Sequence, residues 1–210
     1  MGSIKKILWR NNVPSLRTMN LNNNNHIMNH SETRFLVADY VKYRMQRQGY
    51  EYNCNQLPHP TRINQVLRIL GDEFEQKYRS NFEDMRNQIH ITPDTAQQCF
   101  LQIIAELFRD GVRWGRVIAL FAFTGTIAAQ CVEQEMPSLV DNIVDWSSNY
   151  VNTHLMSWIN ENGGWDGLIQ FYEGGNKIQD QQWPSFKTIF SYAAGAVGIV
   201  TIGAFLAQKS

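Results

Sequence analysis

The chain lacks the short motifs that build common catalytic and phosphate-binding sites. It has no G-x-S-x-G nucleophile turn, no glycine-rich phosphate loop, no His-Glu-x-x-His pair and no Cys/His set at metal-ligand spacing. Its five histidines lie mostly in polar segments and turns, where a solvent-exposed imidazole is the ordinary state. We therefore expect a binding protein that is not an enzyme and uses no cofactor or metal.

Cysteine is scarce, and neither sign of charge is in excess. The three cysteines, Cys54, Cys99 and Cys131, form no C-x-x-C pair and no disulfide pattern, which fits a reducing compartment. Nineteen Lys and Arg residues balance nineteen Asp and Glu residues, so the formal net charge is +0. Without a positive excess, nucleic acid is not an expected partner.

Acidic residues are missing from the first part of the chain. Residues 1–31 carry four Lys and Arg residues but no Asp or Glu, and they include the asparagine-rich stretch NLNNNNHIMNH. No apolar core of a secretory signal is present. The composition would also suit a transit peptide, but a disordered polar tail over 1–31 is the simpler interpretation.

One long uncharged run lies near the C-terminal end. Residues 189–207 contain no charged side chain and are flanked by Lys187 and Lys209. This length suffices to cross a bilayer, which takes about 20 residues. We predict a C-terminal membrane anchor within 185–210, with the rest of the chain on the cytosolic side. The alternative is a buried core helix.

A second uncharged run, residues 117–132, is shorter and sits in the middle of the chain. Sixteen residues are too few for a comfortable bilayer span, so we predict a central core helix. Around it, apolar residues recur at helical spacing and no alternating strand pattern is found. The sequence predicts an all-α domain over 32–184, a bundle of about eight helices around a central hydrophobic helix.

Helix boundaries follow from breakers and caps. A helix starting near Thr33 should stop at Gly49, and a single helix should carry one apolar face through the segment from Arg62 to Met85. Thr92 is the expected cap of a further helix that ends at Gly111.

Positive charge gathers where the central helix begins. In ELFRDGVRWGR, residues 106–116, Arg116 falls in the first turn of that helix, and Gly115 permits close backbone approach. An arginine there offers a fork of donors to a carboxylate, and the nearby apolar residues suit an amphipathic partner helix. The alternative is that Arg116 only pairs with an internal acid such as Asp110. The residues alone leave both open.

Four segments resemble the homology motifs of one known family. They are, in the order first to fourth motif, ELFRDGVRWGR, WINENGGWDGLIQFY, LRILGDEF and TRFLVADYVKYRMQRQGY. On these motifs the chain is identified as a member of the B-cell lymphoma-2 family of apoptosis regulators. It is most similar to the pro-survival branch, and the similarity extends from about Ser31 to Lys209.

The resemblance implies a groove that receives the third-motif helix of pro-apoptotic relatives, both Bax/Bak-like effectors and single-motif death ligands. An aspartate of that helix would pair with Arg116, and mitochondrial outer-membrane permeabilisation would be prevented. The implied location is the mitochondrial outer membrane facing the cytosol, with the endoplasmic reticulum also permitted and a part in the cytosol. By motif position, the groove residues are Phe74, Tyr78, Phe82, Met85, Glu106, Leu107, Arg109, Arg113, Gly115, Arg116, Ala119, Phe123 and Tyr172.

Two departures and two alternatives accompany this resemblance. Arg113 stands where the family usually has Asn, and we hypothesise a preference for partners with extra acid. The link from Gly49 to Pro60 is short where several relatives have a long loop. LRILGDEF could be presented as a death ligand, but its leucines are expected in the core. The alternative functions are a pore-forming effector of the Bax/Bak type and an anchored scaffold with a vestigial groove.

Overall fold

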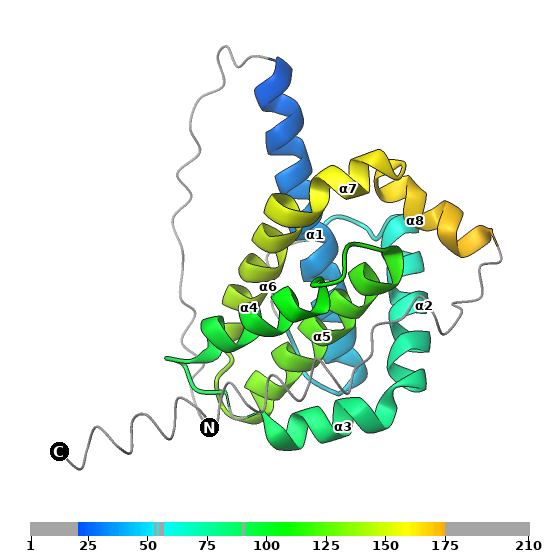
Figure 1. The fold of residues 1–210 in the computed structure, drawn as a ribbon. Helices are drawn as coiled ribbons and strands as arrows, with labels where there is room; N and C mark the ends of the chain where they lie inside the picture. Colours follow the sequence, from blue (N-terminus) through cyan, green and yellow to red (C-terminus); the bar gives the residue numbers. More distant parts are fainter. Residues whose placement is uncertain (1–20, 53, 55–56, 90, 175–210) are drawn as a thin grey trace.

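The structure is a computed structural model that describes residues 21–52, 54, 57–89 and 91–174. In this part every regular element is helical and no strand occurs, as the sequence predicted (Figure 1). The predicted anchor at 189–207 lies outside the described residues. The elements are α1 (Leu21–Arg47), α2 (Arg62–Lys77), α3 (Arg79–Gln88), α4 (Ala96–Leu107), α5 (Trp114–Glu133), α6 (Leu139–Tyr150), the π-helical segment η1 (Val151–Leu155), α7 (Met156–Glu161) and α8 (Gly164–Glu173).

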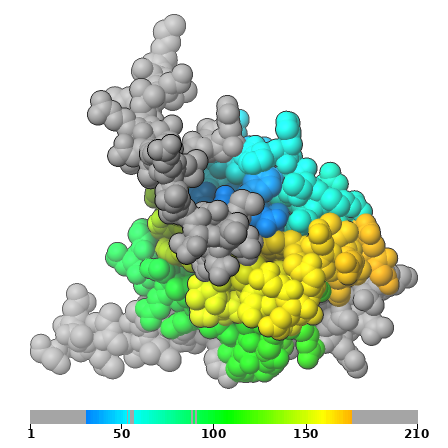
Figure 2. All heavy atoms as spheres, turned by 90° about the horizontal axis from the view of Figure 1, so that it is seen from above, coloured from blue at the N-terminus to red at the C-terminus, as the bar shows by residue number. Residues whose placement is uncertain are grey.

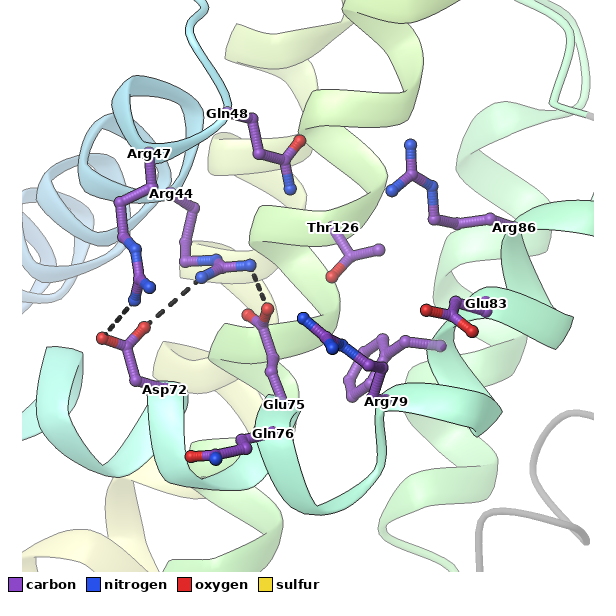
Figure 3. A pocket seen from close by; sticks show the side chains of 11 residues that line it. Arg44, Arg47, Gln48, Asp72, Glu75, Gln76, Arg79, Glu83, Arg86 and Thr126 are labelled. Carbon is purple, nitrogen blue, oxygen red and sulfur yellow. Dashed lines mark hydrogen bonds and ion pairs between the residues drawn. The ribbon is translucent and has the colours of Figure 1, made fainter.

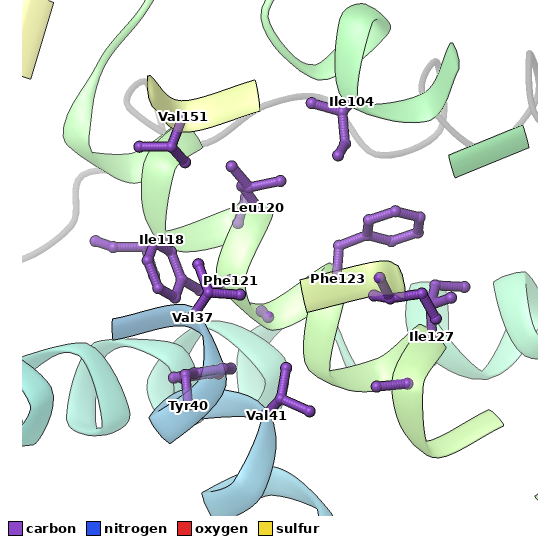
Figure 4. Packing of buried hydrophobic residues seen from close by; sticks show 14 of the residues in the cluster. Val37, Tyr40, Val41, Ile104, Ile118, Leu120, Phe121, Phe123, Ile127 and Val151 are labelled. Atoms are coloured by element: carbon purple, nitrogen blue, oxygen red, sulfur yellow. The ribbon is translucent and has the colours of Figure 1, made fainter. Parts of the chain in front are cut away.

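Helix α5 forms the centre of the bundle, which confirms the prediction for residues 117–132. Every side chain from Trp114 to Cys131 is buried, and α1, α2 and α6 are its main packing neighbours. Figure 4 shows Val37, Tyr40 and Val41 of α1 approaching the apolar side chains of α5. By length and composition, α5 is also the one helix among the described residues that could cross a membrane.

The segment predicted as one helix through Met85 is divided into α2 and α3. The backbone of Tyr78, at φ −109° and ψ 25°, leaves the helical region between them. Its ring still packs on Phe74, with 5.0 Å between the ring centroids. The apolar face continues across the break through Phe74, Tyr78 and Phe82. The apolar periodicity of the sequence therefore could not reveal the break.

Helix α4 begins three residues later than predicted, with Thr95 in place of Thr92 as the N-cap. The Thr92 carbonyl accepts hydrogen bonds from the amides of Thr95 and Ala96, at 3.1 and 2.9 Å, so these residues form a separate turn. The helix ends at Leu107, before the predicted breaker Gly111, whose φ is +100°. Gly49, the predicted stop of the first helix, follows the end of α1 at Arg47 and has a left-handed backbone with φ +83°.

A charged cluster joins α1 to α2. Arg44 pairs with Asp72 and Glu75, and Arg47 pairs with Asp72 (Figure 3). The Tyr43 hydroxyl donates a hydrogen bond of 2.5 Å to Asp72. We call these five residues the α1–α2 clamp. Its four charged members line one side of a cavity of about 680 Å³ between α1, α2, α3 and α5. The aspartate of LRILGDEF is thus held by the chain's own first helix.

Helices α1 and α2 approach closely at Gly71. A Cβ atom there would clash with the Tyr40 hydroxyl and lie 2.7 Å from two carbons of its ring. Leu67 and Leu70, one turn away or less, are 1% and 2% exposed. The third-motif leucines therefore face this chain's own core, and that interpretation of LRILGDEF is confirmed.

Gly71→Ala should lower the free energy of unfolding by about 1–3 kcal/mol, the usual effect of overpacking. By helix propensity alone, the same change would stabilise an exposed helix by about 1 kcal/mol, so the sign is diagnostic. Chemical denaturation measures it. Tyr40→Leu, combined with Gly71→Ala, should reduce the loss below the sum of the single changes. Strictly additive losses would contradict the proposed clash.

Glu75→Gln should alter how stability depends on pH. Burial raises the pKa of Glu75 to about 7, although Arg44 acts in the opposite direction. The folded state holds this proton more tightly than the unfolded state. The protonated carboxyl therefore contributes fully to the free energy of unfolding below pH 4.5, and this contribution is lost as the pH rises to 7. The loss is at most about 1.4 kcal/mol per pH unit.

Denaturation between pH 4.5 and 8 tests this dependence. Protonation of Glu75 should make the free energy of unfolding of the wild type decrease as the pH rises across that range, and Glu75→Gln should abolish this decrease. Glu73→Gln, an exposed neighbour on α2, serves as the matched control and should keep the wild-type slope. Parallel curves for the wild type and Glu75→Gln would contradict the prediction.

Candidate peptide-binding site

The thirteen residues predicted to line a groove come from five helices and the turns between them. They are Phe74 on α2, Tyr78 between α2 and α3, Phe82 and Met85 on α3, Glu106 and Leu107 on α4, Arg109 in the next turn, Arg113 at the N-cap of α5, Gly115, Arg116, Ala119 and Phe123 on α5, and Tyr172 on α8. Helices far apart in sequence thus contribute to it.

The apolar members are buried or half-buried, and their ring contacts fall into two groups. Phe74 packs on Tyr78 and, edge to face at 5.9 Å, on Phe82, which ties α2 to α3. Phe123 of α5 stacks on Phe100 of α4 with 5.5 Å between the centroids. Phe100 was not among the predicted residues. The core of the site is therefore built from aromatic side chains on α2 to α5.

Arg116 is the buried cation of the site. The residue is 8% exposed. Its Nη1 donates a hydrogen bond of 2.7 Å to the Gly111 carbonyl, and its Nη2 lies 3.4 Å from Asp110 Oδ2. The internal pairing with Asp110, which the sequence left open, is therefore present. The Asp110 side chain is 68% exposed, and exposed ion pairs contribute only about 0–1 kcal/mol.

Further charges continue along the same edge. Arg109 Nη1 lies 2.7 Å from Glu106 Oε1, and its Nε lies 3.6 Å from Asp110 Oδ1. Arg113 is exposed at the start of α5. We call Glu106, Arg109, Asp110, Arg113 and Arg116 the charged rim. Three arginines against two acids leave it with one net positive charge, beside the positive end of the α5 dipole.

Trp114, two residues before Arg116, anchors the start of α5. Its ring meets Trp158 at 5.2 Å and Trp165 at 6.3 Å. Gly167 allows this packing, because a Cβ atom there would lie 3.1 Å from Trp114 and would clash with the Asn162 carbonyl. The second-motif segment therefore fixes the end of the helix that carries Arg116. In the sequence, Trp158 and Trp165 stand out only as parts of the second motif.

Tyr172 lies near the C-terminal end of α8. Its described ring contact is with Arg62 at the start of α2, 5.9 Å from guanidinium carbon to ring centroid, and Arg62 also pairs with Glu173. Helix α8 packs against α2, and seen from above its orange atoms lie beside cyan atoms of the part of the chain that includes α2 (Figure 2). The structure thus brings Tyr172 to α2, without a described contact to the charged rim.

Arg113→Asn should stabilise the fold. Arg113 occupies the N-cap position of α5 and makes no capping hydrogen bond, whereas Asn is among the best N-cap residues. We expect the free energy of unfolding to rise by about 1 kcal/mol, measured by chemical denaturation. Arg113→Ala is the control, because it removes the charge without supplying a cap. Equal gains in both variants would contradict a capping effect.

Comparisons with known proteins agree on one family. Residues 67–165, which include every predicted groove residue except Tyr172, match the family described as apoptosis regulator proteins, Bcl-2 family. The chain is 44% identical over 156 residues to the apoptosis regulator Bcl-2 of Gallus gallus, covering 72% of this chain and 65% of that protein. It is 42% identical over 148 residues to Bcl-2-like protein 1 of Homo sapiens, covering 70% of this chain and 64% of that protein.

The matched region is thus slightly less than two thirds of the length of these relatives. It nevertheless extends over most of the present chain, and the helical bundle and the four motifs are consistent with the match. This chain belongs to the Bcl-2 family of apoptosis regulator proteins.

Proposed function

We propose that this chain is a pro-survival regulator that binds the amphipathic death-motif helix of pro-apoptotic relatives and so prevents mitochondrial outer-membrane permeabilisation. The main observation in support of this proposal is the environment of the Arg116 guanidinium. This guanidinium is buried beside apolar helices, a backbone carbonyl orients it, and its one described acidic partner is an exposed side chain. Such a group is suited to accept a carboxylate from another molecule.

The surroundings of Arg116 support a helix as the ligand. Amphipathic helices bind in grooves through several apolar anchors at helical spacing, with a polar residue fixing their register. The aromatic side chains on α2 to α5 would receive the anchors, and Arg116 would pair with one aspartate. The partners would be Bax/Bak-like effectors and single-motif death ligands.

The pro-survival direction is supported by two observations. The relatives found by comparison are named Bcl-2 and Bcl-2-like protein 1. The fourth-motif helix α1 is also complete and is tied to α2 by the α1–α2 clamp. A pore-forming effector of the Bax/Bak type is the second candidate, because α5 is long and apolar enough to cross a membrane.

The cellular location is part of the proposal. Residues 189–207 would anchor the chain in the mitochondrial outer membrane, with the helical domain in the cytosol; the flanking Lys187 and Lys209 are also compatible with the endoplasmic reticulum.

Arg116→Ala should weaken binding of a death-motif peptide by roughly 2–5 kcal/mol, because the peptide's aspartate would be buried without a partner. Calorimetric titration measures the loss, and a thermal melt checks the fold. Arg109→Ala is the matched control: the Arg109 side chain is 50% exposed, so its removal should cost less than about 1 kcal/mol. Unchanged affinity in Arg116→Ala would exclude this residue from the mechanism.

Dye release from liposomes separates the two candidate functions. A pro-survival chain should leave vesicles sealed when added alone and should block the release caused by an activated effector. The Arg116→Ala variant should block less well, because it holds the effector's helix more weakly. Release by the chain alone would instead identify a pore-forming effector.

A further inference from the structure

We infer that Asp110 acts as an internal competitor for the groove: it occupies Arg116 in the free chain, and a partner's aspartate has to replace it. The inference rests on the proposed function and adds a residue that regulates affinity and selectivity at the same site. The Arg116 guanidinium contacts two different acceptors.

One of these acceptors holds the guanidinium in place. The Gly111 carbonyl accepts a 2.7 Å hydrogen bond from Nη1 and belongs to the turn that precedes α5, where Gly111 has φ +100°. A backbone carbonyl cannot move away without rebuilding that turn. Arg116 therefore stays oriented whether or not a carboxylate is bound, and its side-chain entropy is largely lost before a partner arrives.

The other acceptor is easily exchanged. Asp110 Oδ2 lies 3.4 Å from Nη2, at the long end of hydrogen-bond distances, and the side chain is 68% exposed. A partner carboxylate would form the same kind of bond within a more buried interface, where charge-assisted hydrogen bonds are stronger. Replacement of Asp110 by the partner is therefore favoured.

A displaced Asp110 would still have a neighbouring cation. Arg109 Nε already lies 3.6 Å from Asp110 Oδ1, and the Arg109 side chain is half exposed. After the exchange, Asp110 can pair with Arg109 and with water, so neither carboxylate is stranded. The exchange thus replaces the ion pair between Asp110 and Arg116 with one between Asp110 and Arg109.

The competitor has opposite effects on two kinds of partner. For a helix with the aspartate, Asp110 has to be removed from Arg116, so its presence weakens binding. For a helix without it, Asp110 remains as the counter-ion of a guanidinium that the helix covers, so its presence helps binding. Asp110 therefore reduces the difference in affinity between the two.

Asp110→Asn tests this with one death-motif peptide and the same peptide carrying Asn in place of its aspartate. The aspartate peptide should bind about two- to five-fold more tightly to Asp110→Asn than to wild type, which matches the range for an exposed ion pair. The Asn peptide should bind no more tightly than to wild type, and in an Arg116→Ala background the gain should disappear.

Glu73→Gln is the control, since it removes the same charge from an exposed position on α2 outside the predicted groove residues. It should leave the ratio of the two affinities at the wild-type value. An equal gain in Glu73→Gln would mean long-range electrostatics and would overturn the inference. So would an unchanged or weaker affinity of Asp110→Asn for the aspartate peptide.

Failure of the inference can be told from failure of the proposed function. If wild type binds neither peptide, or binds them without dependence on Arg116, the groove function itself is wrong. If wild type binds the aspartate peptide through Arg116 and Asp110→Asn changes nothing, the groove function stands and only the competitor is excluded.

Discussion

The burial of α5 on every side is the constraint on which the other features depend. A helix without a polar face cannot lie on a protein surface, so neighbouring helices have to surround it. Here α1, α2 and α6 do so, while Gly111 and Arg113, just before its first turn, are exposed. Arg116 lies in that first turn, so a buried cation adjoins both the apolar interior and exposed residues.

Small residues and charge pairs set how closely the surrounding helices approach. Gly71 admits the Tyr40 ring between α1 and α2, and Gly125 of α5 lets Arg44 lie against it, with 2.8 Å from a hypothetical Cβ to Arg44 Cγ. The same Arg44 then pairs with two acids of α2. Close packing and buried charge thus both hold α1 against its neighbours α2 and α5.

Much of the fold could be predicted because it follows from local patterns. The uncharged run identified the central helix, and glycines with positive φ marked the ends of helices. The break at Tyr78 could not be predicted, because the apolar spacing continues through it. The later start of α4 was missed because two threonines, three residues apart, are equally good caps.

The candidate residues, Arg116 and the aromatic side chains, follow from motif positions, and that they line a groove stays a prediction. The contact between Arg116 and Asp110 was one of the two options that the sequence left open for the arginine. Which option is realised depends on the turn at Gly111, whose shape no residue pattern specifies. The partners of Asp72 and Glu75 were not foreseen at all, since they come from α1, about thirty positions away in the chain.

The close fit at Gly71 has a mechanical consequence. Tyr40 fills the space over that glycine, and Arg44 and Arg47 hold the adjoining carboxylate, so α2 cannot rotate its leucines outward while α1 remains docked. Any rearrangement that offers α2 to another molecule has to begin with the departure of α1.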